Sequence, residues 1–186
     1  MANKKTGYLF PQTEKPSPKP TAKKPRKKSA AELALKTIQE AKDKNSRSDI
    51  IAKMAKSEES WVCEVLIQSL SDPSEDIREF IVTRLAERDD LDLGLLYSRL
   101  QKTHWYVKTG CLRVVGLKKN ADSVKYISSL VDDPNIEVRR TLATVLGEIG
   151  GNEAAALLTK LSEDTSCFVR NRAIQALQDI SQVKFS

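Results

Sequence analysis

Two seven-residue stretches decide the fold of this chain: Asp72-Pro73-Ser74-Glu75-Asp76-Ile77-Arg78 and Asp133-Pro134-Asn135-Ile136-Glu137-Val138-Arg139. Each contains aspartate, proline, three variable residues, an aliphatic residue and arginine. Residues 164–170 keep the aspartate, the aliphatic residue and the arginine, whereas residues 102–108 have lysine at both charged positions. The four aliphatic residues recur at intervals of 30, 31 and 31 positions: Ile77, Val107, Val138 and Val169. A repeat of this length indicates stacked helical units.

Apolar residues within each repeat have the spacing of a helix that buries one face. Further apolar side chains stand four and eight positions after the aliphatic residue, namely Ile81 and Leu85, Cys111 and Val115, Leu142 and Leu146, Ala173 and Leu177. Side chains at this spacing lie on one helical stripe. The aspartate or threonine before the stripe can cap the helix, and the missing amide of a proline in the first turn needs no partner.

A second helix fills the rest of each repeat and ends at an aligned leucine: Leu70, Leu100, Leu130 or Leu161. A two-helix hairpin cannot bury its apolar face alone, so the hairpins must stack. Residues 48–56 and 60–70 are interpreted as a divergent first unit, and residues 30–42 as a leading helix capped by Ser29. We predict an all-α fold, an α-solenoid of about five two-helix repeats over residues 29–180, followed by a short tail, 181–186.

The aspartate-to-arginine element resembles the HEAT repeat, in particular the short HEAT-like variety named from phycobilin lyases. The resemblance covers about residues 47–180. It implies a buried hydrogen-bonded ladder between successive repeats, formed by Asp72, Arg78, Asp133, Arg139, Asp164 and Arg170. Lys102 and Lys108 depart from the pattern. Because lysine lacks the planar bidentate fork of arginine, we expect the ladder to be interrupted at that repeat.

The net charge of +6 is unevenly distributed along the chain. Residues 1–28 hold nine of the 31 basic residues and one of the 25 acidic ones, which leaves residues 29–186 with 22 and 24. Five of the seven prolines also lie in this first segment, so we predict a disordered basic tail. The candidate nucleic-acid-binding residues are Lys19, Lys23, Lys24, Arg26, Lys27 and Lys28. Flexible cations can neutralise phosphates, bind an anionic membrane surface, or simply keep the chain soluble.

The irregular repeat supplies the main candidate partner-binding site. Lys102 and Lys108 enclose His104, Trp105 and Tyr106, the single histidine and two aromatic residues, at a turn between helices. Aromatic side chains beside cations are typical of interface anchors and of surfaces that stack bases. The alternative is that Trp105 fills the groove between helices, because it aligns with two residues that look partly buried, Ile136 and Cys167.

A second candidate surface lies on the helices that end at the aligned leucines. Arg99 and Lys160 occupy equivalent positions, and Lys125 lies one turn before the equivalent Ser129. In a solenoid such residues would line up across the concave surface, where ligands commonly bind. The alternative is a solvated face with dispersed charges.

The sequence offers little for catalysis or metal binding. It has one histidine, and its three cysteines, Cys63, Cys111 and Cys167, fall at or near core positions without metal-ligand spacing. The acidic clusters lack the spacing and the glycine of a calcium loop and are interpreted as helix caps. The resemblance extends to deoxyhypusine hydroxylases, but their iron-binding His-Glu pairs are absent here. We therefore expect no cofactor, no metal and no enzymatic activity.

These observations predict a scaffold that binds a protein partner. The alternatives are a nucleic-acid-associated protein that uses the basic tail, and a lyase or chaperone for a chromophore-bearing protein. Unpaired cysteines and the lack of 18 consecutive apolar residues predict a cytoplasmic protein without a membrane span, or a nuclear one in a eukaryote. The last helix, residues 167–180, has no helix after it to cover it, so its end is either covered by the short tail or a docking edge. The oligomeric state stays open.

Overall fold

The computed structural model describes residues 29–101 and 103–183, and in these residues the chain is helical without any strand. Ten α-helices follow one another: α1 (Ala30–Glu40), α2 (Lys44–Met54), α3 (Trp61–Ser69), α4 (Glu75–Glu87), α5 (Leu93–Arg99), α6 (Trp105–Lys118), α7 (Val124–Ile127), α8 (Ile136–Ile149), α9 (Gly151–Leu161) and α10 (Cys167–Val183). Short 3-10 segments, Ala121–Ser123 and Ser128–Asp132, flank α7. The predicted all-α fold is confirmed. The basic tail and residues 184–186 lie outside the described residues.

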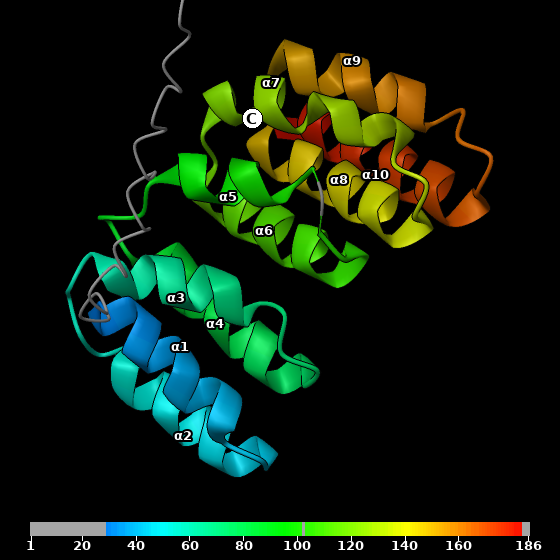
Figure 1. The fold of residues 1–186 in the computed structure, drawn as a ribbon. Coiled ribbons are helices and arrows are strands. Elements are labelled where there is room, and N and C mark those ends of the chain that lie inside the picture. Colours follow the sequence, from blue (N-terminus) through cyan, green and yellow to red (C-terminus); the bar gives the residue numbers. More distant parts are fainter. Residues whose placement is uncertain (1–28, 102, 184–186) are drawn as a thin grey trace, which may run out of the picture.

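The helices form antiparallel hairpins that stack side by side (Figure 1). Helices α4, α6, α8 and α10 pack on one another in order, and we call them the stacked layer. Helices α1, α3, α5, α7 and α9 cover one side of it and form the flanking layer. This arrangement is the predicted α-solenoid. It places the aspartate-to-arginine element of each repeat at a junction between neighbouring hairpins.

The core follows the predicted apolar stripe. In α8 the three stripe residues Val138, Leu142 and Leu146 have no exposed surface, and the same holds for Leu70 at the end of α3. Each buried aliphatic side chain of this size contributes about 1.5–3 kcal/mol. In the last repeat Leu177 is only half-buried. Because the other repeats bury their stripes between the layers, the repeats are stabilised mainly by their neighbours.

In three repeats the aspartate accepts a hydrogen bond within the turn before the helix. The expectation that this aspartate caps the helix is therefore wrong. Asp133 accepts a hydrogen bond from the amide of Asn135 (2.9 Å), and Asn135 in turn caps α8 by accepting from the amides of Glu137 and Val138. Asp72 and Asp164 accept from the amides two residues ahead in the same way, both at 2.8 Å. The aspartate therefore sets the loop geometry, and a separate residue begins the helix.

Three predicted helices have other bounds in the structure, and one of them is α10, which runs to Val183 instead of ending at residue 180. The helix predicted at residues 48–56 begins at Lys44, because Asp43 accepts from the amide of Ser46 and caps it. The helix before Leu130 is broken into 3-10 and α segments. At the N-terminal end, Ser29 caps α1 as predicted, since its hydroxyl accepts from the amide of Glu32 (3.2 Å).

The placement of one cysteine was predicted wrongly. Cys63 and Cys111 are buried, as expected, but Cys167 is exposed. Cys167 is the first residue of α10, and its counterpart Ile136 at the start of α8 is also 44% exposed. This position begins the helix ahead of the buried stripe, so the side chain lies outside the contact between layers.

Candidate functional site

A ladder of charge-assisted hydrogen bonds connects the repeats. At the junction between α8 and α10, Arg139 donates from Nε and Nη2 to the two carboxylate oxygens of Asp164, at 2.7 and 2.9 Å. Its third nitrogen, Nη1, donates to the main-chain oxygen of Asp133 (2.8 Å). The side chains of the pair are only 11% and 7% exposed. The arginine lowers the pKa of Asp164 and the carboxylate raises the pKa of Arg139, mainly through the hydrogen bonds between them.

Two further junctions contain an equivalent pair, and one of them corrects the expected interruption. Lys108 donates from Nζ to Asp133 at 2.6 Å, so the lysine replaces the arginine with a single contact instead of leaving a gap. Arg47 donates to both oxygens of Asp72, at 2.7 and 3.2 Å. The sequence pattern missed Arg47 because its repeat has Ala41 where three of the other repeats have aspartate.

The ladder lacks an acid at the junction between α4 and α6, which we call the α4/α6 junction. Arg78 uses Nη1 as Arg139 does, donating to the main-chain oxygens of Asp72 (2.7 Å) and Pro73 (3.0 Å). The position of its acidic partner is occupied by Lys102, which lies outside the described residues. Among the residues that the structure describes, no carboxylate pairs with Arg78; its guanidinium lies 5.2 Å from the centre of the Tyr106 ring instead.

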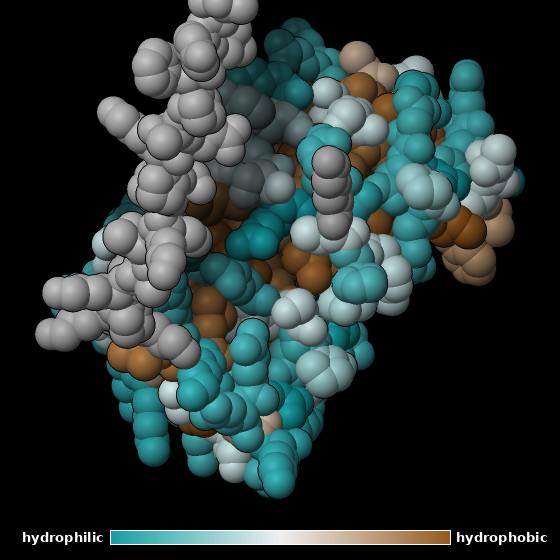
Figure 2. All heavy atoms as spheres, in the orientation of Figure 1, coloured by the Kyte–Doolittle hydropathy of each residue, from teal (hydrophilic) through white to brown (hydrophobic). Residues whose placement is uncertain are grey.

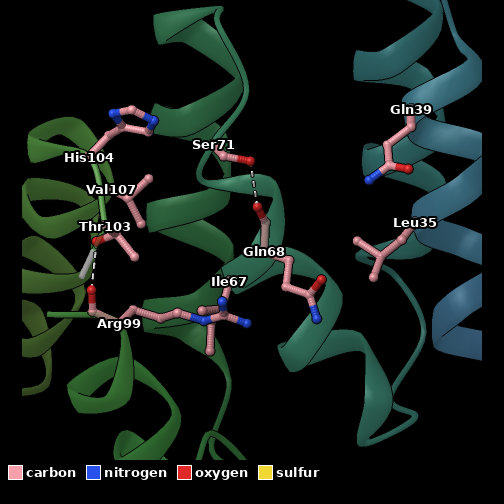
Figure 3. A pocket seen from close by; sticks show the side chains of 9 residues that line it. All are labelled: Leu35, Gln39, Ile67, Gln68, Ser71, Arg99, Thr103, His104 and Val107. Carbon is pink, nitrogen blue, oxygen red and sulfur yellow. Dashed lines mark hydrogen bonds between the residues drawn. The ribbon is translucent and has the colours of Figure 1, made fainter. Parts of the chain in front are cut away.

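A pocket of about 530 Å³ opens at this junction on the side of the flanking layer (Figure 3). It is lined by Leu35, Gln39, Ile67, Gln68, Ser71, Arg99, Thr103, His104 and Val107. Figure 3 shows Arg99 extending from α5 past Ile67 toward Gln68, with Leu35 and Gln39 facing it from α1. Arg99 is half-buried, and no acidic residue within the described part of the chain forms an ion pair with it. The pocket thus combines a guanidinium, two amides and an apolar wall.

Three aromatic rings stand on the turn that begins α6, and one of them, His104, lines the pocket. His104 stacks on Tyr106 with 5.3 Å between ring centres, and Trp105 meets Tyr106 edge-on at 5.8 Å. Trp105 is 46% exposed, so it does not fill a groove inside the fold. Figure 2 shows apolar residues between polar ones on the face that carries α3 and α5.

A second recess, of about 420 Å³, runs over the stacked layer, where Arg78, Trp105 and Tyr106 line it together with charged residues of α4, α6 and α8. Two of its three acids are bound by arginines of the same recess. Arg113 binds both carboxylate oxygens of Glu79, which lowers the pKa of that carboxyl, and Arg140 binds Glu137 at 2.6 Å. The sequence did not reveal this recess because its residues come from three different repeats. The aromatic turn therefore contributes to two recesses, one on each layer.

The remaining predicted cations lie apart from this site. Lys160 pairs with Asp132 at 2.8 Å on the surface of the next junctions, and Lys125 lies 5.0 Å from the ring of Tyr126. Lys108 belongs to the ladder. Of the predicted partner-binding residues, the structure therefore gathers Arg99, His104, Trp105 and Tyr106 at one junction and does not align Arg99, Lys125 and Lys160 into one binding surface. Lys102 and the six tail cations lie outside the described residues.

Neither metal ligands nor a membrane span appear in the described part of the chain. No group of three or more histidine, cysteine or acidic residues converges there, and none of its helices is long and apolar enough to cross a membrane. Several residues of the acidic clusters serve local structure: Asp92 caps α5 by accepting from the amide of Gly94 (2.8 Å), and Asp90 pairs with Arg88.

Comparison with known proteins confirms the class of fold. Residues 93–178 match the family described as HEAT repeats, so the predicted HEAT-like repeats are present. A chain of the complex of CpcE and CpcF of phycocyanin lyase from Nostoc sp. PCC7120 is similar, with a TM-score of 0.55 and 19% identity over 90% of this chain and 71% of that one. A designed armadillo repeat protein aligns with a TM-score of 0.45 and 18% identity over 79% and 80% of the two chains. No curated protein matches. The protein is an α-solenoid, and its residues 93–178 are similar to HEAT repeats.

Proposed function

We propose that this protein is a non-catalytic scaffold that binds a protein partner at the α4/α6 junction. The observation that carries the proposal is the half-exposed Trp105, which is held edge-on against Tyr106 and lines one recess with the half-buried Arg78, while the half-buried Arg99 lines the other recess of the same junction. Tryptophan, tyrosine and arginine are the residues that most often dominate binding energy in protein interfaces. Two recesses beside these side chains provide concave surfaces into which a partner can pack, and an isolated surface residue would not provide them.

The residues around the junction also favour a role without catalysis. The ring of His104 stacks on Tyr106, and neither it nor Arg99 forms a hydrogen bond with a carboxylate of the described chain that could orient it for proton transfer. Burial raises the pKa of the Cys111 thiol to about 12, which keeps it protonated and unreactive. The described cysteines are free thiols, which fits a reducing compartment such as the cytoplasm.

The test is affinity capture from cell lysate with the full-length chain, in the presence of nuclease. Trp105→Ala should remove a specific partner protein from the recovered set, because truncating an aromatic anchor typically costs more than 1–2 kcal/mol, or about 10-fold in affinity. Phe168→Ala is the matched control, since Phe168 is 68% exposed and lies at the start of α10. Recovery that is equal for both variants would count against the proposal.

A second candidate function rests on the basic tail. Nine basic residues and one acid within residues 1–28 can release counterions from phosphates, which would give nucleic-acid binding that is independent of sequence and steeply dependent on salt. Binding of a random double-stranded DNA that is unchanged between low and physiological salt, or that survives replacement of the tail cations by glutamine, would exclude this mode.

A third candidate is a lyase or chaperone for a chromophore-bearing protein. Its support is the similarity to a chain of phycocyanin lyase, which at 19% identity concerns the fold. Co-expression with a bilin and a carrier protein would test it, and failure to obtain a coloured adduct would remove this candidate.

A further inference from the structure

We infer that the α4/α6 junction binds an acidic segment of the partner protein, whose carboxylates pair with Arg99 and Arg78 where the solenoid lacks its own acids. The inference rests on the proposed function and names the chemistry of the partner. It comes from comparing this junction with other junctions of the same chain, three of which have the ladder acid and one of which has the second acid.

The first missing acid belongs to the ladder. At three other junctions, a cation on one helix binds an aspartate in the loop before the next helix of the stacked layer: Arg47 binds Asp72, Lys108 binds Asp133 and Arg139 binds Asp164. At the α4/α6 junction the equivalent position is Lys102, which has no acceptor. We expect a carboxylate from another molecule to pair with Arg78 instead.

The guanidinium group of Arg78 is already positioned to bind such a carboxylate. Its Nη1 donates to the main-chain oxygen of Asp72 at 2.7 Å, as Nη1 of Arg139 does to Asp133 at 2.8 Å. In Arg139 this anchoring leaves Nε and Nη2 for the two oxygens of Asp164. Contact with the Tyr106 ring further fixes the guanidinium of Arg78. A preorganised fork loses little side-chain entropy when it binds a carboxylate bidentately.

The second missing acid lies in the pocket. Lys160, the residue before the aligned leucine of α9, pairs with Asp132, the residue before the ladder aspartate of the preceding hairpin. The counterparts at the α4/α6 junction are Arg99 and Ser71, and both line the pocket. Serine in place of aspartate leaves the half-buried guanidinium of Arg99 without its acid. Arg99 in the pocket and Arg78 in the recess of the stacked layer are therefore both without a carboxylate partner among the described residues.

Charge also selects the occupant. The basic segment 1–28 of the same chain carries the same sign as this junction and is therefore a poor occupant. Glu79, which lines the recess of the stacked layer together with Arg78, is already bound by two guanidinium nitrogens of Arg113. An acidic protein segment would meet Arg99 in the pocket and cover its apolar wall of Leu35, Ile67 and Val107 with aliphatic side chains.

The test uses the full-length chain in which Lys19, Lys23, Lys24, Arg26, Lys27 and Lys28 are replaced by glutamine, so that the tail does not attract the probe. The probe is a fluorescein-labelled peptide of repeated Asp-Leu-Glu-Ala, and its control is the same peptide with the amides Asn and Gln. Fluorescence anisotropy should show saturable binding of the acidic peptide and much weaker binding of the amide peptide. We expect Arg99→Gln to weaken binding about 10-fold, as loss of a charge-assisted hydrogen bond does.

Two further variants make the result specific. Lys160→Gln changes the residue equivalent to Arg99 at a junction whose acid is present, and should leave the affinity unchanged. Lys102→Asp supplies the missing carboxylate from within the chain. It should raise the melting temperature, because Arg78 gains a partner, and weaken peptide binding by competing for that guanidinium. Circular dichroism before titration verifies that each variant is folded.

The inference is overturned if Arg99→Gln and Lys102→Asp both leave the affinity unchanged, or if the amide peptide binds equally well. It is also overturned if a labelled single-stranded RNA binds the tail-neutralised chain more tightly than the peptide and loses its affinity with Arg99→Gln, because the junction then takes phosphate. If the acidic peptide does not bind but Trp105→Ala still abolishes capture of the partner, the proposed function stands and only the acidic chemistry of the partner is rejected. Unaffected capture with Trp105→Ala would remove the function itself.

Discussion

Removing the carboxylate of Asp164 should destabilise the solenoid more than any surface charge change. Asp164 receives two hydrogen bonds from Arg139 and one from the amide of Ser166, at 2.7, 2.9 and 2.8 Å, and both side chains of the pair are about nine-tenths buried. Breaking a buried ion pair by removing one partner costs about 3–5 kcal/mol, because the other charge is left without compensation. Since Nη1 of Arg139 keeps its bond to the main chain of Asp133, we place the cost of Asp164→Ala near the lower limit, at about 3 kcal/mol.

The assay is urea denaturation, followed by circular dichroism and by the fluorescence of Trp61 and Trp105. Coincident transitions would justify a single free energy of unfolding, which repeat proteins do not always have. A loss of about 3 kcal/mol corresponds to a decrease in melting temperature of about 6–12 °C in a chain of this size.

A neighbouring ion pair provides the matched control. Asp132 pairs with Lys160 at a similar distance of 2.8 Å, but its side chain is 73% exposed. Exposed pairs contribute about 0–1 kcal/mol, so Asp132→Ala should change little. If Asp164→Ala were as mild as Asp132→Ala, the ladder would not be a stabilising element and the comparison between junctions would lose its basis.

The remaining predictions concern acid stability, packing and thiol reactivity. Ion pairing lowers the pKa of both Asp164 and Glu79. Their contribution to the stability of the fold is therefore present above the pKa of an unfolded carboxyl, about 4, and is lost as the pH falls through the lower folded pKa values. Urea midpoints measured from pH 6 to pH 2 should decline, and less steeply in Asp164→Asn. Gly147→Ala should destabilise by about 1–3 kcal/mol despite the better helix propensity of alanine, because the added Cβ would lie 2.8 Å from the Cβ of Ala176; an unchanged midpoint would show that α8 and α10 can separate freely. Dithionitrobenzoate should label Cys167 quickly and Cys111 only on unfolding, since Cys111 is buried with its pKa raised to about 12. A folded wild-type chain that rapidly loses one more thiol than folded Cys111→Ser would contradict that burial.

The repeat spacing predicts the fold because it reports directly on burial. The residues at Ile77, Val107, Val138 and Val169 are all buried at 6% exposure or less, as one stripe per helix requires. The same spacing predicts the aspartate and arginine of the ladder. It does not identify Arg47, which lies in a repeat without the aspartate, nor does it reveal that Lys108 is long enough to reach Asp133.

The site is less predictable because it depends on which residues face each other across a junction. The sequence singles out His104, Trp105, Tyr106 and Arg99, and the structure places them together. It also groups Lys125 and Lys160 with Arg99, although Lys160 pairs with Asp132 in the fold and Arg99 has Ser71 in the equivalent place. A single sequence shows charges but not their partners, so unpaired and paired cations look alike until the loops before the helices are placed.

The central claim is that a protein partner binds at the α4/α6 junction, and photo-crosslinking tests it most directly. A photoreactive phenylalanine derivative would replace Trp105 in the full-length chain, or Tyr126, an aromatic residue 49% exposed on α7, as the control. After irradiation in nuclease-treated lysate, we predict a discrete protein adduct from position 105 that weakens with Arg99→Gln and is absent from position 126. Equal adducts from both positions, or an adduct at 105 that Arg99→Gln leaves unchanged, would contradict the account.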